Sequence, residues 1–343
     1  MELETTMAAP AGYDALRSTA AWLDLSARGK IKASGEDRAR LLHAMTTNQV
    51  QELTPGTGCY AYFLTAQGRI LADANILCRP DYFLLDTEPE TRDKILHHLD
   101  SYIIADDVTL EDLTEKLSTI AVEGPQAEAI LVNLGAPAPE QDYANAEWGE
   151  RLVVRATYSG GQGFFILTPV AHKDRLIQEL ASAGVERGSE EAFRVVRIEN
   201  GRPRYGEDIS ERYLAQETNQ PRAINYQKGC YLGQEIVERV RSRGQVHRVL
   251  MPVTIDATER PEPGAKLQTA AATPSCEAPG GARTGAGEQI ATSSNAGEIS
   301  SAAFSPALGR VVALAYLRVE YARPGVPLAL AGIQNVTVGR GAT

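Results

Sequence analysis

The segment Asn225–Glu235 holds the densest set of residues that could do chemistry. It reads Asn-Tyr-Gln-Lys-Gly-Cys-Tyr-Leu-Gly-Gln-Glu, so Cys230 lies between two glycines and two positions after Lys228. Glycines allow a sharp turn and the close approach of another group to the backbone. A thiol that precedes a helix N-terminus, with a lysine beside it, is expected to have enhanced thiolate character, as in a nucleophile, a soft-metal ligand or a redox sensor. The alternative is a buried cysteine that packs as a small apolar side chain.

A second pattern is a carboxylate at the end of a predicted helix, residues 190–200. Glu199 would meet the negative end of the helix dipole, which is a poor position unless a ligand or a cation compensates. One carboxylate can accept two hydrogen bonds from a ring N–H and an adjacent amine. The alternative is a surface glutamate that pairs with Arg202 or Arg204.

Asp73 ends the segment Gly68-Arg-Ile-Leu-Ala-Asp73 in a predicted strand, where a carboxyl group could act as a general acid or base. A solvent-facing strand aspartate is the alternative. The run 238–248 is basic, with Arg239, Arg241, Arg243, His247 and Arg248. It could bind an acidic partner or phosphates, but a solvated helix face with a Glu235–Arg239 pair is the commoner explanation.

Bulk properties restrict the class of protein. A chain of 343 residues exceeds one ordinary core, so we expect two or three domains. The net charge of −10 disfavours direct nucleic-acid binding. None of the four cysteines has C-x-x-C spacing, so we expect no zinc or redox pair and no metal site. The chain shows neither an apolar leader nor a run of 18 apolar residues, so we expect a cytoplasmic protein without membrane contact.

The patterns of apolar residues predict an α+β protein with mainly antiparallel sheets. Two similar sets of strands and helices are expected within 12–245, at approximately 12–115 and 116–245, with segments exchanged between them. From about 246 to 343, short strands with Gly- and Pro-rich turns predict a small β-barrel. The Ala-, Gly- and Ser-rich stretch 269–296 cannot bury enough apolar surface to order itself, so we expect a disordered insertion.

The first segment carries the K-G-C-Y-x-G-Q-E signature of YgfZ-type proteins, a branch of the aminomethyltransferase (T-protein) superfamily, which this chain resembles. Its residues are Lys228, Gly229, Cys230, Tyr231, Gly233, Gln234 and Glu235. The resemblance also covers 41–48, 55–73, 195–248 and 297–318. It implies a cloverleaf of two α+β domains and a C-terminal β-barrel, with tetrahydrofolate or a one-carbon derivative at the centre.

The resemblance also implies roles for particular residues. The superfamily's pterin-binding element, a glutamate followed by x-G and Y-G-x-D-I, is matched by Glu199 and Tyr205. Its G-x-I-x-x-D element places Asp73 near the reactive nitrogens of folate, while Ala72 stands where aminomethyltransferases often have a second acid. Arg248 is assigned to folate, whose glutamate tail the basic run 238–248 could hold, and Cys230 is implied to be needed for activity.

The function implied first is a folate-binding accessory protein for the assembly or maintenance of iron–sulfur enzymes, including those that modify tRNA. Its partners would be iron–sulfur proteins or their assembly machinery. The alternatives are a folate-dependent aminomethyltransferase of the glycine cleavage system and a protein-binding adaptor with a decayed folate pocket. Cys230 and Ala72 favour the first over the second. If the protein is an enzyme, we expect one-carbon (aminomethyl) transfer.

Overall fold

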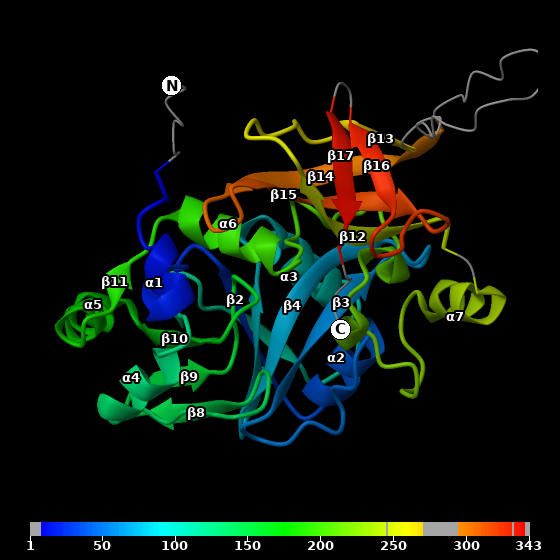
Figure 1. The fold of residues 1–343 in the computed structure, drawn as a ribbon. Coiled ribbons are helices and arrows are strands. Elements are labelled where there is room, and N and C mark those ends of the chain that lie inside the picture. The colour runs from blue at the N-terminus through cyan, green and yellow to red at the C-terminus, as the bar shows by residue number, and fades with distance from the viewer. Residues whose placement is uncertain (1–7, 245, 270–293, 331–332, 340–343) are drawn as a thin grey trace, which may run out of the picture.

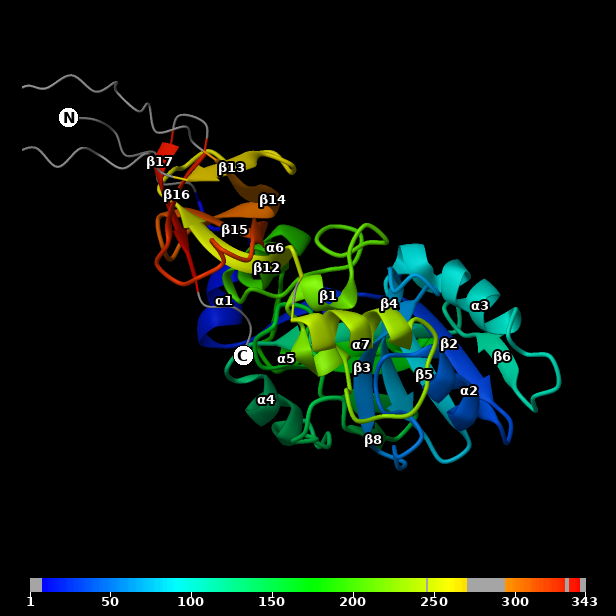
Figure 2. The ribbon, with the colours of Figure 1, turned by 90° about the vertical axis from the view of Figure 1, so that its right-hand side faces the viewer.

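Two open sheets and a closed barrel form the protein (Figure 1). The computed structural model describes residues 8–244, 246–269, 294–330 and 333–339. Figure 2 shows the barrel at one side of the molecule and the five-stranded sheet, with its two helices, at the other. The predicted α+β class with mainly antiparallel sheets and a C-terminal barrel is therefore confirmed.

The five-stranded sheet is antiparallel throughout and has two helices on its outer face. Its strands, in spatial order, are β3 (Gly58–Leu64), β4 (Ile70–Cys78), β5 (Tyr82–Thr87), β2 (Gly29–Ser34) and β6 (Thr109–Asp112). The helices are α2 (Arg38–Met45) and α3 (Arg92–Asp100), and the short 3-10 turn η1 (Pro89–Thr91) precedes α3. Leu42, Ile95 and Leu99 anchor the helices to the sheet.

The six-stranded sheet joins the start of the chain to its middle. Its spatial order is β11 (Glu186–Arg187), β1 (Ala21–Asp24), β7 (Leu117–Glu123), β10 (Gly163–Pro169), β9 (Arg151–Val154) and β8 (Asn145–Trp148). Strand β1 pairs antiparallel with β7 and parallel with β11. Helices α4 (Ala127–Asn133) and α5 (Lys173–Ser182) pack on one face. Helices α1 (Tyr13–Ser18) and α6 (Glu190–Glu199) contribute to the central core on the other.

The barrel closes in the order β12 (Arg248–Ile255), β15 (Arg310–Arg318), β14 (Asn295–Ser305), β13 (Lys266–Thr269), β16 (Pro327–Leu330) and β17 (Ile333–Val338). The expected disordered insertion lies almost wholly in 270–293, outside the described residues. Helix α7 (Gln234–Arg243) stands at the edge of the molecule in Figure 1. Three further 3-10 turns are η2 (Val170–His172), η3 (Ala215–Thr218) and η4 (Pro221–Ala223).

Strand alternation decides which residues face the centre. Successive side chains of a strand point to opposite faces. In β4 the side chains of Ala72, Ala74 and Ile76 lie in the core beneath α2 and α3. Asp73 and Asn75, which alternate with them, therefore face the space between the two sheets, where both line a cavity.

The segment Ser34-Gly-Glu-Asp37 predicts a helix capped by Ser34, and residues 89–102 predict another helix; both predictions were wrong in detail. Ser34 does not cap a helix, because it ends β2 and its hydroxyl points to the Thr109 carbonyl across the sheet at 3.4 Å. The helix begins at Arg38 instead. The helix predicted for 89–102 is a 3-10 turn followed by α3, which ends at Asp100. The domain boundaries near 115 and 245 stay a prediction, and the pairing of β1 with β7 is the kind of segment exchange it anticipates.

Candidate functional site

The central cavity lies between the inner faces of the two sheets and has a volume of about 40 Å³, which is smaller than ordinary small-ligand sites. Its walls come from both sheets and from the segment after α6. The lining residues are Arg28, Tyr60, Asp73, Ala74, Asn75, Glu88, Thr157, Tyr158, Phe165, Arg197, Arg202, Pro203, Arg204 and Arg222. Of the residues predicted from sequence, Asp73 is in this cavity.

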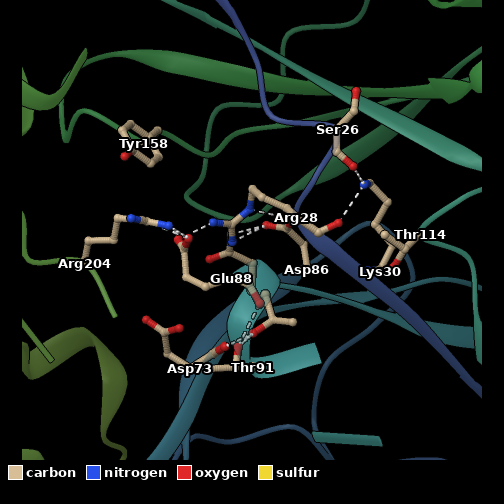
Figure 3. Close-up of polar contacts among 12 residues, drawn as sticks. Ser26, Arg28, Lys30, Asp73, Asp86, Glu88, Thr91, Thr114, Tyr158 and Arg204 are labelled. Carbon is tan, nitrogen blue, oxygen red and sulfur yellow. Dashed lines mark hydrogen bonds and ion pairs between the residues drawn. The ribbon is translucent and has the colours of Figure 1, made fainter. Parts of the chain in front are cut away.

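Arginine and carboxylate side chains alternate along one wall of the cavity (Figure 3). We call this group the charged wall, and its members in order are Arg204, Glu88, Arg28 and Asp86. Arg28 Nε and Nη2 donate to the two oxygens of Asp86 at 2.8 and 3.0 Å, and Nη1 donates to Glu88. Arg204 reaches the second oxygen of Glu88 at 2.8 Å. Burial alone would raise the pKa of Glu88, but Arg28 and Arg204 hold it below its usual range. Asp86 and Glu88 are therefore both paired with arginine.

Asp73 has a different environment. Only 7% of it is exposed, and its Oδ2 accepts a hydrogen bond from Tyr60 Oη at 2.7 Å. Burial, with Glu88 as a second cause, raises the pKa of Asp73 to about 6 despite the opposing charges of Arg28 and Arg222. A carboxyl group with such a pKa gains and loses a proton near neutral pH, which suits a general acid or base.

Aromatic side chains supply flat walls beside these charges. Tyr60, Tyr158 and Phe165 line the cavity, and the ring of Tyr158 is visible above Arg204 in Figure 3. The loop that carries Tyr158 is fixed by the buried carboxylate of Glu123. This carboxylate accepts hydrogen bonds from the backbone N–H groups of Tyr158 and Ser159 at 2.5 and 3.0 Å. Tyr60, Tyr158 and Phe165 thus give the cavity aromatic walls, against which a planar ring could stack.

Glu199 is not among the residues that line this cavity. It ends α6, and its two oxygens accept hydrogen bonds from Tyr13 Oη at 2.6 Å and Arg17 Nη1 at 2.8 Å. The predicted compensating cation is therefore Arg17 of α1, and the suggested pairing with Arg202 or Arg204 is wrong. Since Glu199 and Asp73 do not share the cavity, a pterin role for Glu199 stays a prediction.

Tyr205 and Arg248 also lie outside the cavity wall. The Tyr205 hydroxyl donates to the Leu71 carbonyl at 2.6 Å, so it holds β4 two residues before Asp73. Arg248 pairs with Glu217 at 3.0 Å and stacks over the Tyr213 ring at 4.7 Å, where the barrel meets the turn η3. Its role toward folate stays a prediction.

Lys228 does not serve as a cationic neighbour of the Cys230 thiol, so that prediction was wrong. Its Nζ is buried and donates to the carbonyls of His43, Thr46 and Asn48 at 2.5, 2.5 and 2.8 Å. These carbonyls follow or end α2, where backbone acceptors lack helical partners. Burial lowers the pKa of Lys228 to about 7. The lysine therefore fastens the signature segment to the end of α2.

The rest of the signature segment turns the chain and exposes the thiol. The N–H of Leu232 donates to the Ala44 carbonyl at 2.9 Å, a second tie to α2. Gly233 has φ +82°, and a Cβ there would lie 2.7 Å from the Thr65 carbonyl oxygen, so only glycine fits. Gln234 and Glu235 begin α7, with the glutamate exposed. Cys230 is a free, exposed cysteine outside the cavity lining.

Replacing Lys228 with methionine is expected to lower the free energy of unfolding by about 2 kcal/mol or more. Three carbonyls lose their buried donor while the length of the side chain is kept. Urea unfolding measures the loss, and alkylation of Cys230 should become faster as the segment loosens. Lys94→Met, at an exposed lysine paired with Glu211, is the matched control. Equal stability of the two variants would contradict the anchoring role.

Several cavity residues were missed in the sequence. Arg28, Glu88, Arg204 and Arg222 carried no recognised motif, although Asp86-x-Glu88 at the end of a predicted strand places two acids on one face. In the described part of the chain no three His, Cys, Asp or Glu side chains are grouped so as to hold a metal ion. No helix there combines the length and apolar character needed to cross a membrane.

Comparison with protein families matches two domains. The GCVT N-terminal domain matches residues 5–228, and the glycine cleavage T-protein C-terminal barrel domain matches residues 276–335. The crystal structure of the glycine cleavage system aminomethyltransferase T from Bartonella henselae superposes with a TM-score of 0.82 at 19% identity. It covers 96% of this chain and 87% of that chain, so the two share a fold.

Curated relatives show the same relationship in sequence. A chloroplastic protein of Arabidopsis thaliana, described as a candidate transferase, is 28% identical over 72% of this chain, but the match spans only 59% of that protein. The aminomethyltransferase of Rubrobacter xylanophilus is 27% identical over 90% of this chain and 79% of its own length. The aminomethyltransferase of Chloroherpeton thalassium is 25% identical over 91% of this chain and 83% of its own length.

Proposed function

Since the chain belongs to the glycine cleavage T-protein family, we propose that it is a tetrahydrofolate-binding accessory protein of the YgfZ-type branch. In this proposal it supports the assembly or maintenance of iron–sulfur enzymes, including those that modify tRNA. The observation that supports this proposal most directly is the complete signature segment, in which Cys230 lies at the surface and outside the cavity. An exposed thiol on an anchored loop is available to a protein partner, whereas a substrate in the cavity does not meet it.

The chemical character of the cavity residues supports tetrahydrofolate as the ligand, and its entry requires side chains to move because the cavity volume is about 40 Å³. Tyr158 and Phe165 offer aromatic faces for a planar ring, and Asp73 offers a carboxyl group that exchanges a proton near neutral pH. When bound, tetrahydrofolate supplies nitrogens that carry a one-carbon unit. The chain's own contribution is to hold the ring, to keep Asp73 in place through Tyr60 and Tyr205, and to maintain the charged wall of Arg28 and Glu88.

The second candidate is a folate-dependent aminomethyltransferase, which is favoured by relatives of that name over about nine-tenths of this chain. A transfer assay distinguishes the accessory function from the aminomethyltransferase function. It uses the purified protein, tetrahydrofolate and an aminomethylated lipoyl-carrier protein. The accessory function predicts tetrahydrofolate binding without turnover, and robust transfer would establish the second candidate instead. A ligand at 100 times its Kd should raise the melting temperature by about 4 °C. Absence of any shift would indicate an adaptor with a decayed pocket.

Glu199→Gln tests the pterin role that the family motif implies. If Glu199 accepts two pterin hydrogens, the amide should weaken tetrahydrofolate binding about tenfold or more, because it cannot accept both. If the carboxylate only ties α6 to α1, stability should fall while the dissociation constant is unchanged. Arg17→Met is the matched control, since it removes that tie and leaves the carboxylate. Titration calorimetry and urea unfolding of both variants give the answer.

The partners in this proposal are iron–sulfur proteins or their assembly machinery. They would meet the surface around Cys230, next to the basic helix α7. We also propose a cytoplasmic location for this protein, in contrast to the chloroplastic relative from Arabidopsis thaliana.

A further inference from the structure

Two of the arginines that line the central cavity have no acidic partner in the described part of the chain. The other three are neutralised: Arg28 by Asp86 and Glu88, Arg197 by Glu207 and Asp208, and Arg204 by Glu88. Arg202 and Arg222 also line the cavity, yet neither forms an ion pair with a described residue. In a protein of net charge −10, two cavity guanidinium groups without an ion pair are an unusual concentration of positive charge, and the carboxyl group they influence is Asp73, where the charge of Arg222 opposes the rise in pKa that burial causes.

Both guanidinium groups lie against one ring. The guanidinium carbon of Arg222 is 4.5 Å from the centroid of Tyr60, and that of Arg202 is 6.0 Å away. Arg222 donates from Nη1 to Tyr143 Oη at 2.8 Å and from Nε to Gln220 Oε1 at 3.2 Å. Its Nη2 has no partner among the described residues, so donors of Arg222 stay available for a ligand.

The Tyr60 side chain also fixes the distance between these cations and the acid. Its hydroxyl donates to Asp73, while its ring contacts Arg202 and Arg222. The acid and the guanidinium groups therefore surround one aromatic ring, with Asp73 at its hydroxyl and the arginines over its face. A ligand that reaches both would present an N–H or amine to Asp73 and an anion to the arginines.

We propose that Arg202 and Arg222 bind a carboxylate group of a ligand in the central cavity. The planar fork of a guanidinium matches the two oxygens of a carboxylate. This inference rests on the proposed folate function, in which carboxylates are the available anions. Two sources share the chemistry: the glutamate tail of folate, and a small amino acid that gives or accepts the one-carbon unit.

The experiment measures ligand binding by calorimetry and melting temperature at fixed ionic strength. The probes are tetrahydrofolate, tetrahydropteroate (which lacks the glutamate), glycine, sodium acetate and inorganic phosphate. The variants are Arg202→Met, Arg222→Met and Arg222→Lys, with Arg310→Met on the barrel as the control. If Arg222→Met unfolds, Arg222→Lys and the unmodified protein with acetate still test the charge.

If the bound carboxylate is the glutamate tail of folate, the unmodified protein should bind tetrahydrofolate about tenfold or more tightly than tetrahydropteroate. Both methionine variants should then abolish this difference in affinity. If the bound carboxylate is that of a small amino acid, tetrahydrofolate and tetrahydropteroate should bind with equal dissociation constants. Glycine and acetate then raise the melting temperature of the unmodified and Arg310→Met proteins, but not of the cavity variants.

The inference is overturned if no carboxylate probe responds to either substitution, or if phosphate alone responds. Failure of the unmodified protein to bind tetrahydrofolate counts against the proposed function. The glycine and acetate measurements still decide the carboxylate site in that case, so the two failures are distinguishable.

Discussion

Cys230→Ala is expected to abolish rescue of a strain deficient in iron–sulfur enzyme maintenance while leaving the fold and tetrahydrofolate binding intact. The thiol is exposed and lies outside the cavity lining, so its removal creates no buried void and no change in the cavity. The turn around it is held by Lys228 and by the backbone of Leu232, which the substitution does not touch. Loss of function would therefore come from the sulfur itself.

The readout is tRNA thiomethylation in cells, together with the melting temperature and tetrahydrofolate affinity of the purified variant. Gln227→Ala, an exposed neighbour in the same loop, is the control and should retain full rescue. Cys230→Ser tests whether a hydroxyl can replace the thiol, and we expect that it cannot, because a serine does not form the anion that makes cysteine a nucleophile. Unimpaired rescue by Cys230→Ala would remove the thiol from the function.

Arg28→Met is expected to lower the free energy of unfolding by about 3–5 kcal/mol, the cost of breaking a buried ion pair from one side. Asp86 and Glu88 are both buried, and each relies on Arg28 for hydrogen bonds as well as charge. Glu88 keeps Arg204, but Asp86 retains only the Asn75 amide at 2.8 Å. The variant therefore holds a buried carboxylate without a cation.

Urea unfolding measures the loss, and its pH dependence identifies the cause. Without Arg28, the pKa of Glu88 should rise in the folded variant, because burial raises it and Arg28 is the first of the charges that hold it below its usual range. Protonation then relieves the penalty, so the deficit should be smaller near pH 5 than near pH 8. Arg175→Met, which removes a surface pair with Glu179, should cost less than about 1 kcal/mol. A comparably small loss for Arg28→Met would contradict the stabilising role of Arg28 in the charged wall.

The fold class and Asp73 could be anticipated because their signals are local. Strand alternation around Ala72, Asp73 and Ala74 already separates a polar face from an apolar one. The charged wall could not be anticipated in this way, since Arg28, Glu88 and Arg204 are separated by 60 and 116 positions and meet only when the sheets pack. Sequence proximity gives no information about such pairings.

Lys228 illustrates a different limit. Its position two residues before Cys230 suggested a charge interaction, but proximity along a turn does not fix the direction of a long side chain. The ammonium group turned toward α2 because three backbone carbonyls there lacked donors, a need that belongs to residues about 180 positions earlier. Glu199 was expected to need a ligand or a cation, and the structure supplies a cation, Arg17, which is 182 positions away.

Strand β1 can complete its pairing only after much later segments of the chain have been synthesised. Residues 21–24 leave the ribosome early, yet their partners are β7, at 117–123, and β11, at 186–187. At about 5–20 residues per second, β1 waits roughly 10 s or longer for its last neighbour. During that time its edge is open to strands of other nascent chains, a known route to aggregation. Expression trials that slow translation after residue 24 should therefore lower the soluble yield, and a chaperone that shields the first 30 residues should restore it.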